Sequence, residues 1–281
     1  MEILAPLVTA FYRKGRSCLR SILLLMVILL VRTEVWAQRV TENNGHLWVS
    51  HWGDHRISEH WSFHTKAHWR RANLGRDGQQ LLLRPAINYH LNEQVMFTAG
   101  YSYYINYPYD TYPIPFSNWE HHLFQQVQLT NPIGRLRIQH RFRIEERFVA
   151  RIRQDTEDPT IGEFDGYNYL NRFRYRLWLT LPLGHEQSGP GVFTVNLYDE
   201  FFLNFGEPGR LNNINQNRLS ALVGYQVNKP LNVMIGYLLQ DLQRPGAANG
   251  NDLVEMNSTL HFVLVYNLDL RRQARQNDGP K

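Results

Sequence analysis

Apolar and polar side chains alternate with a period of two residues through most of this chain. Between residues 135 and 148, for example, Leu136, Ile138, Phe142 and Ile144 fall on one face, while the other face is rich in arginine. Residues two apart point to the same side of a strand but not of a helix. The pattern therefore predicts an all-β protein.

Eleven segments carry this alternation, and many exceed ten residues, which is longer than the usual strand of about 5–6 residues in soluble sheets. Strands of roughly 9–11 residues or more are what a tilted bilayer crossing requires. The segments are 46–56, 61–70, 79–91, 94–105, 118–130, 135–148, 167–183, 192–205, 215–228, 231–242 and 253–270. The strand number stays open between ten and twelve, because 46–56 is short and Asn44-Gly45 can form a hairpin turn.

The connections between these segments also alternate in length. The short ones are predicted at 91–93, 130–133 and 227–230, and the longer, polar ones at 106–117, 150–165, 206–214 and 243–252. Short turns at one end and long loops at the other are typical of outer-membrane barrels. We therefore expect a transmembrane, antiparallel, up-and-down β-barrel of 10–12 strands in the bacterial outer membrane. The alternative is a secreted β-sandwich, which would bury the apolar face and leave the basic face to water.

The first 37 residues have the features of a cleavable signal peptide. Basic residues precede an apolar stretch at 22–31, and Ala37 supplies the small residue at the cleavage site. We expect cleavage after Ala37, one barrel over residues 38–270 and a polar periplasmic tail at 271–281; a single N-terminal anchor helix is the alternative. The only cysteine, Cys18, lies in the signal segment, so the mature chain has no thiol for disulfides, metal ligation or nucleophilic catalysis.

The charge and composition restrict the partners of the chain. The formal net charge is +5, of which residues 1–37 contribute +3, so the mature chain carries only +2 and a nucleic-acid partner is not indicated. Trp, Tyr and Phe make up 13% of the residues, which excludes general disorder. The expected partners are outer-membrane lipid, the barrel-assembly machinery during biogenesis and small anionic solutes.

A series of motifs resembles the bacterial domain-of-unknown-function family numbered 2490. The motifs occur in the order Leu83-Arg-Pro85, Trp119-Glu-His121, His140-Arg-Phe-Arg-Ile-Glu-Glu-Arg-Phe148, Arg172-Phe-Arg-Tyr-Arg176, Tyr198-Asp-Glu200, Gln216-Asn-Arg218, Gly224-Tyr225 and Gly236-Tyr237 with Gln240. The resemblance covers about residues 47–268, and the motif at 140–148 is its most specific part. It implies an outer-membrane barrel and supplies no catalytic residues, because the family has no established activity.

If the apolar face meets lipid, the opposite face fills the lumen with cations. The expected inward cations are Lys66, Arg70, Arg84, Arg135, Arg137, Arg141, Arg143, Arg147, Arg172, Arg174, Arg176 and Arg218. The expected ion-pair partners are Glu120, Glu145, Glu200 and Glu255. Unpaired charges are costly in a dry interior, so the surplus requires water or anionic ligands. Two functions stay open: a porin-like, anion-selective pore, with these arginines contacting the anion, or a barrel plugged by Arg–Glu ladders that acts through its external loops.

An enzyme or a metal site is not favoured by the sequence. His121 and His140 project outward on neighbouring strands, which suits an embedded lipid-modifying enzyme, but no serine nucleophile is predicted beside them. His60, His64 and His68 are spaced four residues apart, which on a strand separates neighbours by roughly 13 Å, too far to share an ion. We therefore predict no catalytic residues, no metal and no cofactor.

Overall fold

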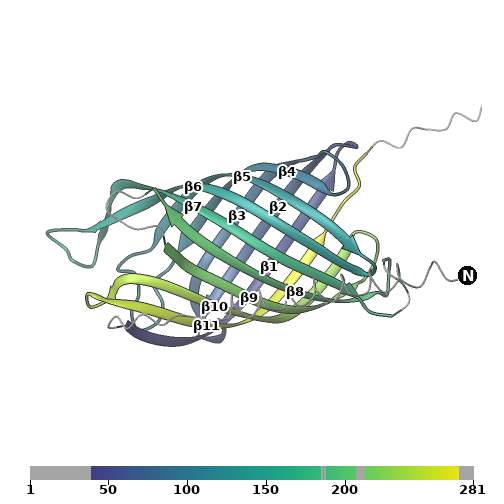
Figure 1. The fold of residues 1–281 in the computed structure, drawn as a ribbon. Coiled ribbons are helices and arrows are strands. Elements are labelled where there is room, and N and C mark those ends of the chain that lie inside the picture. Colours follow the sequence, from purple (N-terminus) through teal and green to yellow (C-terminus); the bar gives the residue numbers. More distant parts are fainter. Residues whose placement is uncertain (1–38, 185, 187, 207–212, 272–281) are drawn as a thin grey trace, which may run out of the picture. The chain divides into compact units, whose positions relative to one another are not determined.

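The computed structural model describes residues 39–184, 186, 188–206 and 213–271. These residues form a β-barrel (Figure 1). Its strands are β1 (Arg39–Arg56), β2 (Trp61–Ala72), β3 (Asp77–His90), β4 (Val95–Asn106), β5 (Asn118–Ile133), β6 (Leu136–Gln154), β7 (Gly162–Pro182), β8 (Phe193–Phe205), β9 (Asn213–Gln226), β10 (Leu231–Ala248) and β11 (Asn251–Tyr266). A short 3-10 helix, η1 (Asn73–Gly75), joins β2 to β3. The predicted signal segment and residues 272–281 of the predicted tail lie outside the described residues.

The barrel is closed, with eleven strands in the described part of the chain. Neighbours in the chain pair antiparallel, and β1 closes the ring by pairing in parallel with β11, because the first and last of an odd number of strands run in the same direction. The prediction of 10–12 strands is confirmed. The alternative of a hairpin turn at Asn44-Gly45 is wrong, since β1 runs through both residues.

The two ends of the barrel are defined by their connections. Among the described residues, the turn end holds 57–60, 91–94, 134–135, 183–184, 186, 188–192 and 227–230, and the loop end holds 73–76, 107–117, 155–161, 206 and 249–250. β1 begins at the loop end and β11 finishes at the turn end. The β6–β7 hairpin projects beyond the other strands at the loop end (Figure 1).

Three predicted connections differ from the structure. The loop predicted at 150–165 is shorter, because β6 continues to Gln154 and β7 begins at Gly162. The segment predicted as a loop at 243–252 is mostly strand, because β10 and β11 continue to a two-residue turn at Asn249-Gly250. Both turn residues have positive φ, 52° and 91°, as the tight hairpin turns that match strand twist require. The short turn predicted at 130–133 lies later, at Gly134-Arg135, where Gly134 has φ 59°.

The two faces of the wall separate the side chains as the alternation predicts. Phe142 is 39% exposed on the outside, whereas its neighbour Arg141 is 5% exposed on the inside. Large apolar side chains are exposed on every strand of the wall, including Val49, Phe63, Ile87, Phe97, Leu123, Phe142, Tyr169, Leu197, Leu219, Ile235 and Leu260. The outer surface is therefore a continuous apolar band, and the interior is the polar side.

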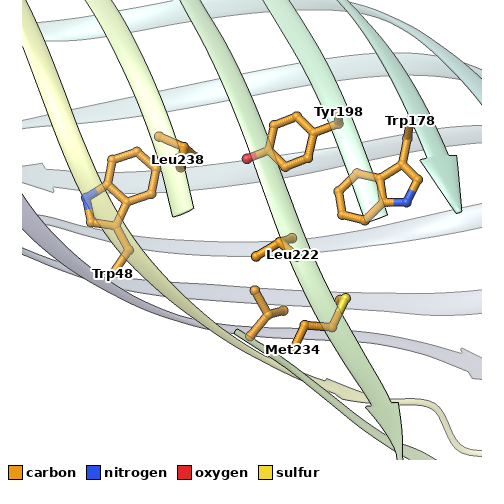
Figure 2. Packing of buried hydrophobic residues seen from close by; sticks show 7 residues of the cluster. Trp48, Trp178, Tyr198, Leu222, Met234 and Leu238 are labelled. Carbon is orange, nitrogen blue, oxygen red and sulfur yellow. The ribbon is translucent and has the colours of Figure 1, made fainter. Parts of the chain in front are cut away.

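Part of the interior is nevertheless an apolar core. Trp178 and Tyr198 stack with ring centroids 4.9 Å apart, and Leu222, Leu238 and Trp48 belong to the same buried cluster (Figure 2). These residues come from β1 and β7 to β10, so the core lies on one side of the lumen. No helix among the described residues is long and apolar enough to span a membrane.

Candidate functional site

Four glutamates inside the barrel organise the lumen arginines. They are Glu120, Glu145, Glu200 and Glu255, and none is more than 8% exposed. The inward face of the alternation predicts all four positions. Each carboxylate accepts charged hydrogen bonds from the arginines around it, so the ion pairs form a network across several strands.

Glu145 is the centre of this network. Its Oε2 accepts hydrogen bonds from Nε and Nη2 of Arg172, at 2.9 and 2.7 Å, and its Oε1 accepts one from Nη1 of Arg174 at 2.7 Å. Guanidinium nitrogens of Arg143 and Arg84 lie 3.5 and 3.6 Å from Oε1. The strand register places Arg172 directly opposite Glu145, which explains the two-pronged pairing.

Glu200 and Glu120 hold the arginines on either side. Arg174 donates to Oε1 of Glu200 from Nε and Nη2, at 2.9 and 2.6 Å, and Arg141 donates to the same oxygen at 2.5 Å. Arg147 donates to Oε2 of Glu120 at 2.7 Å. These pairs let the arginine rows of β6 and β7 lie side by side, although the register sets Arg141 opposite Arg176 and Arg143 opposite Arg174.

Four interior cations have no such partner. Lys66, Arg70, Arg176 and Arg218 have no carboxylate oxygen within 4.0 Å among the described residues. Each instead lies over an aromatic ring, and the distances from cation to ring centroid are 4.3 Å for Lys66 over Trp52, 4.1 Å for Arg70 over Trp48, 4.8 Å for Arg176 over Trp178 and 4.9 Å for Arg218 over Phe202. Ring faces attract cations without neutralising them.

The lumen contains two cavities. The loop-end cavity has a volume of about 330 Å³ and the turn-end cavity about 530 Å³. Four residues line both: Trp52, Lys66, Arg141 and Arg176. We call these four the septum, because their side chains lie between the cavities. All four cations that lack a carboxylate line the loop-end cavity.

A family model described as "Protein of unknown function (DUF2490)" matches residues 45–251. The chain belongs to the DUF2490 family. No curated protein and no solved structure matches this chain. The resemblance seen in the motifs is thereby confirmed, and its most specific part, residues 140–148, is the stretch of β6 that supplies Arg141, Arg143, Glu145 and Arg147 to the network.

Two predicted lumen arginines of this DUF2490 barrel lie away from the network. Arg135 and Arg137 are exposed at the turn end, where they line the turn-end cavity. Arg135 donates hydrogen bonds to the backbone carbonyls of Pro182 and Gly184 in the β7–β8 connection. The other predicted cations face the interior, and Arg84, on β3, also donates to Ser102 Oγ at 2.6 Å.

The connection between β4 and β5 contributes residues that the sequence analysis assigned only to a loop. Tyr109 crosses the mouth to the opposite wall, where its hydroxyl donates to Glu255 Oε2 at 2.9 Å and accepts from Arg244 Nη2 at 2.7 Å. Beside it, Asp110 Oδ2 lies 3.9 Å from Nε2 of His46. Burial raises the pKa of Asp110 to about 6, and the nearby carboxylates of Glu42 and Glu255 add to the shift.

Arg244 is a further lumen cation that the sequence analysis missed. Its Nε lies 2.7 Å from Oε1 of Glu255. The sequence predicts a loop at 243–252, yet the alternation of Leu238, Gln240 and Leu242 on one face of β10 continues to Arg244. The period-two pattern, extended two residues beyond Leu242, places Arg244 on the inward face.

Several histidines form hydrogen bonds with hydroxyl groups. Inside, Ser50 Oγ lies 2.7 Å from Nδ1 of His68 and 2.8 Å from Nε2 of His261. Outside, Tyr101 and Tyr175 pair in the same way with His121 and His140. Among the described residues, no group of three or more His, Cys, Asp or Glu side chains is placed to hold a metal ion.

Proposed function

We propose that this protein is an outer-membrane barrel that admits small anionic solutes and passes them through the septum, in preference to cations. The observation that carries the proposal is the septum itself, in which three of the four side chains are Lys66, Arg141 and Arg176. Any solute that moves from one cavity to the other passes these cations. Rings of basic side chains attract anions and repel cations in pores.

The outer surface supports a membrane location. Apolar side chains such as Phe142, Leu197 and Leu260 are exposed on the outside, and in water a band of this extent would drive aggregation. The described strands are 12–21 residues long, more than the roughly 9–11 residues that a tilted crossing needs. We propose outer-membrane lipid as the surrounding phase, with the turn end in the periplasm and insertion by the barrel-assembly machinery.

The charge balance of the interior supports the choice of anions. The glutamate carboxylates are shared among neighbouring arginines, and Lys66, Arg70, Arg176 and Arg218 keep uncompensated positive charge. Arginine stays protonated in proteins, so the charge of Arg70, Arg176 and Arg218 cannot be removed by losing a proton. Since an uncompensated buried ion costs several kcal/mol, anions are drawn into the lumen and cations are excluded.

A reversal-potential measurement tests the proposal. Purified protein would be inserted into a planar bilayer separating two concentrations of potassium chloride. We expect a reversal potential of the sign set by chloride, and a shift toward zero when Lys66→Gln and Arg176→Gln are combined. Arg151→Gln is the matched control, because Arg151 forms an exposed pair with Asp165 in the projecting hairpin and should leave selectivity unchanged.

Trp52 decides between an open path and a closed barrel. It is the uncharged member of the septum and lies under Lys66. Trp52→Ala should raise the conductance while leaving the sign of selectivity unchanged. A barrel that stays silent in both forms would contradict the proposal and favour the second function, a closed barrel that acts through its loop-end connections. Cation preference would contradict it as well.

A further inference from the structure

We propose that the loop-end cavity is a binding site for a small oxyanion that carries two or more negative charges. The inference rests on the proposed function, since it names the class of anion that the lumen selects. It is carried by the placement of Lys66, Arg70, Arg176 and Arg218 around one cavity, each over an aromatic ring and each without a carboxylate oxygen within 4.0 Å among the described residues. Glu200 lies opposite Arg176 and Arg218 in the strand register but beyond that distance, and its Oε1 is held by Arg141 and Arg174.

The rings fix the orientation of the cations. A guanidinium that lies over a ring keeps its N–H groups at its edge, where they can donate to a ligand. Arg70 on β2 and Arg218 on β9 both lie over the ring of Trp48, with their guanidinium carbons 4.1 and 5.1 Å from the ring centroid. Arg70 also donates to the neutral amide oxygen of Gln80, and the side-chain amide of Gln216 can present its oxygen to Arg218 when its O and N are exchanged. Neutral amides leave the positive charge of both arginines in place.

Two buried guanidinium nitrogens beside this cavity lack an acceptor. Nε of Arg70 and Nε of Arg176 are buried and have no hydrogen-bond partner among the described residues, and Arg70 is only 7% exposed. A buried charged donor without an acceptor is costly. A ligand with several negatively charged oxygens in the cavity would supply the missing counter-charge.

The valence of the ligand follows from the number of cations. Glu120 and Glu200 also line the cavity, but the four cations from β2, β7 and β9 have no carboxylate oxygen within 4.0 Å among the described residues, and a single negative charge would leave most of these four uncompensated. Arginine forks match the paired oxygens of carboxylate, sulfate and phosphate groups. A cavity of about 330 Å³ is far above the roughly 10–15 Å³ that one water molecule needs in this measure, and it accommodates sulfate, phosphate or a compact polycarboxylate.

Tyr109 separates this site from the loop end. With its hydroxyl between Arg244 and Glu255, it lines the same cavity together with Tyr107 and Ile114 of the β4–β5 connection. A compact anion fits under this covering, whereas an extended acidic chain does not. The site therefore favours small, highly charged solutes over polymeric ones.

Calorimetric titration of the refolded protein in detergent micelles tests the inference. The probes are the sodium salts of sulfate, citrate and chloride, so that the inorganic and the organic oxyanion are distinguished from each other and from a monovalent halide. We expect sulfate or citrate to bind at one site and chloride to bind more weakly. Arg70→Gln and Arg218→Gln should each weaken binding by about tenfold or more, since a hydrogen bond to a charged group carries about that factor.

Arg137→Gln is the matched control, because Arg137 lines only the turn-end cavity and should leave the affinity unchanged. The wild-type comparison of sulfate and citrate with chloride needs no variant, so the test survives a variant that fails to fold. Equal affinity for all three salts, no binding, or binding that both arginine variants retain would overturn the inference.

The bilayer experiment separates this inference from the proposed function. An anion-selective conductance with no binding of sulfate or citrate overturns the site and leaves the proposed function standing. Binding that is lost in Arg70→Gln and Arg218→Gln supports the site even where the bilayer measurement shows cation preference, which overturns the proposed function alone.

Discussion

Replacing Glu145 by glutamine should cost more stability than any other single change to a lumen carboxylate. The side chain is fully buried and accepts three hydrogen bonds of 2.7–2.9 Å from Arg172 and Arg174. Arg174 keeps Glu200, but Glu145 is the only carboxylate within 4.0 Å of Arg172 among the described residues. Glu145 is likewise the only carboxylate within 4.0 Å of Arg84 and Arg143 among the described residues. Glu145→Gln therefore leaves three buried guanidiniums without a counter-charge, and breaking even one buried pair in this way costs about 3–5 kcal/mol.

Urea-dependent unfolding in lipid vesicles, followed by tryptophan fluorescence, would measure this loss. Glu163→Gln is the control, because Glu163 pairs with Arg153 at 3.5 Å and both side chains are more than half exposed. Its cost should stay below about 1 kcal/mol, as for other exposed pairs. A Glu145→Gln barrel as stable as the Glu163→Gln barrel would refute the reasoning, because Arg172 would then have found its counter-charge elsewhere.

Three further outcomes can be checked on the same preparation. If the apolar band faces lipid, Phe142→Arg should make membrane insertion less favourable by about 2–4 kcal/mol, and Tyr169→Arg near the loop end should cost only about 0–1 kcal/mol, as measured by refolding into vesicles. Equal costs would contradict that depth assignment. In the folded barrel the pKa of Asp110 is raised to about 6, so between about pH 4 and pH 6 this carboxyl ionises more readily when the β4–β5 connection has left the barrel mouth. Raising the pH over that range should therefore weaken the docking of the connection in the mouth. Amide exchange in residues 107–117, corrected for intrinsic rates, should show this pH dependence and lose it in Asp110→Asn. Tyr109→Phe removes the hydroxyl between Arg244 and Glu255 and should speed exchange of the same amides, and unchanged exchange would mean that other contacts hold the connection.

Much of the lumen could be predicted from the alternation because direction on a strand is a local property. Phe142 and Arg141 face opposite sides wherever β6 lies in the sheet, and the same holds for Arg174 and Glu200 on their strands. Partners on neighbouring strands, such as Glu120 for Arg147, could be anticipated because adjacent inward rows lie side by side. Arg135 faces the predicted side but lies at the turn end, so its side chain binds backbone carbonyls instead.

Pairs between strands that are not neighbours could not be predicted. Arg84 on β3 reaches Glu145 on β6, and Arg141 on β6 reaches Glu200 on β8, because the closed wall brings side chains together across the lumen. The same closure seats Tyr109 between Arg244 and Glu255 on the opposite wall.

The sequence by itself determined that this chain forms long strands with one apolar and one cationic face, because a period of two residues is decided within each strand. Only the tertiary structure decided that eleven strands close with β1 parallel to β11, and which cations are left without a carboxylate. Which arginines the four glutamates neutralise depends on the register and the curvature of the wall, and the register and the curvature depend on every strand in the ring. Closure therefore assigned Glu145 to Arg172 and Arg174, and left Lys66, Arg70, Arg176 and Arg218 around one cavity.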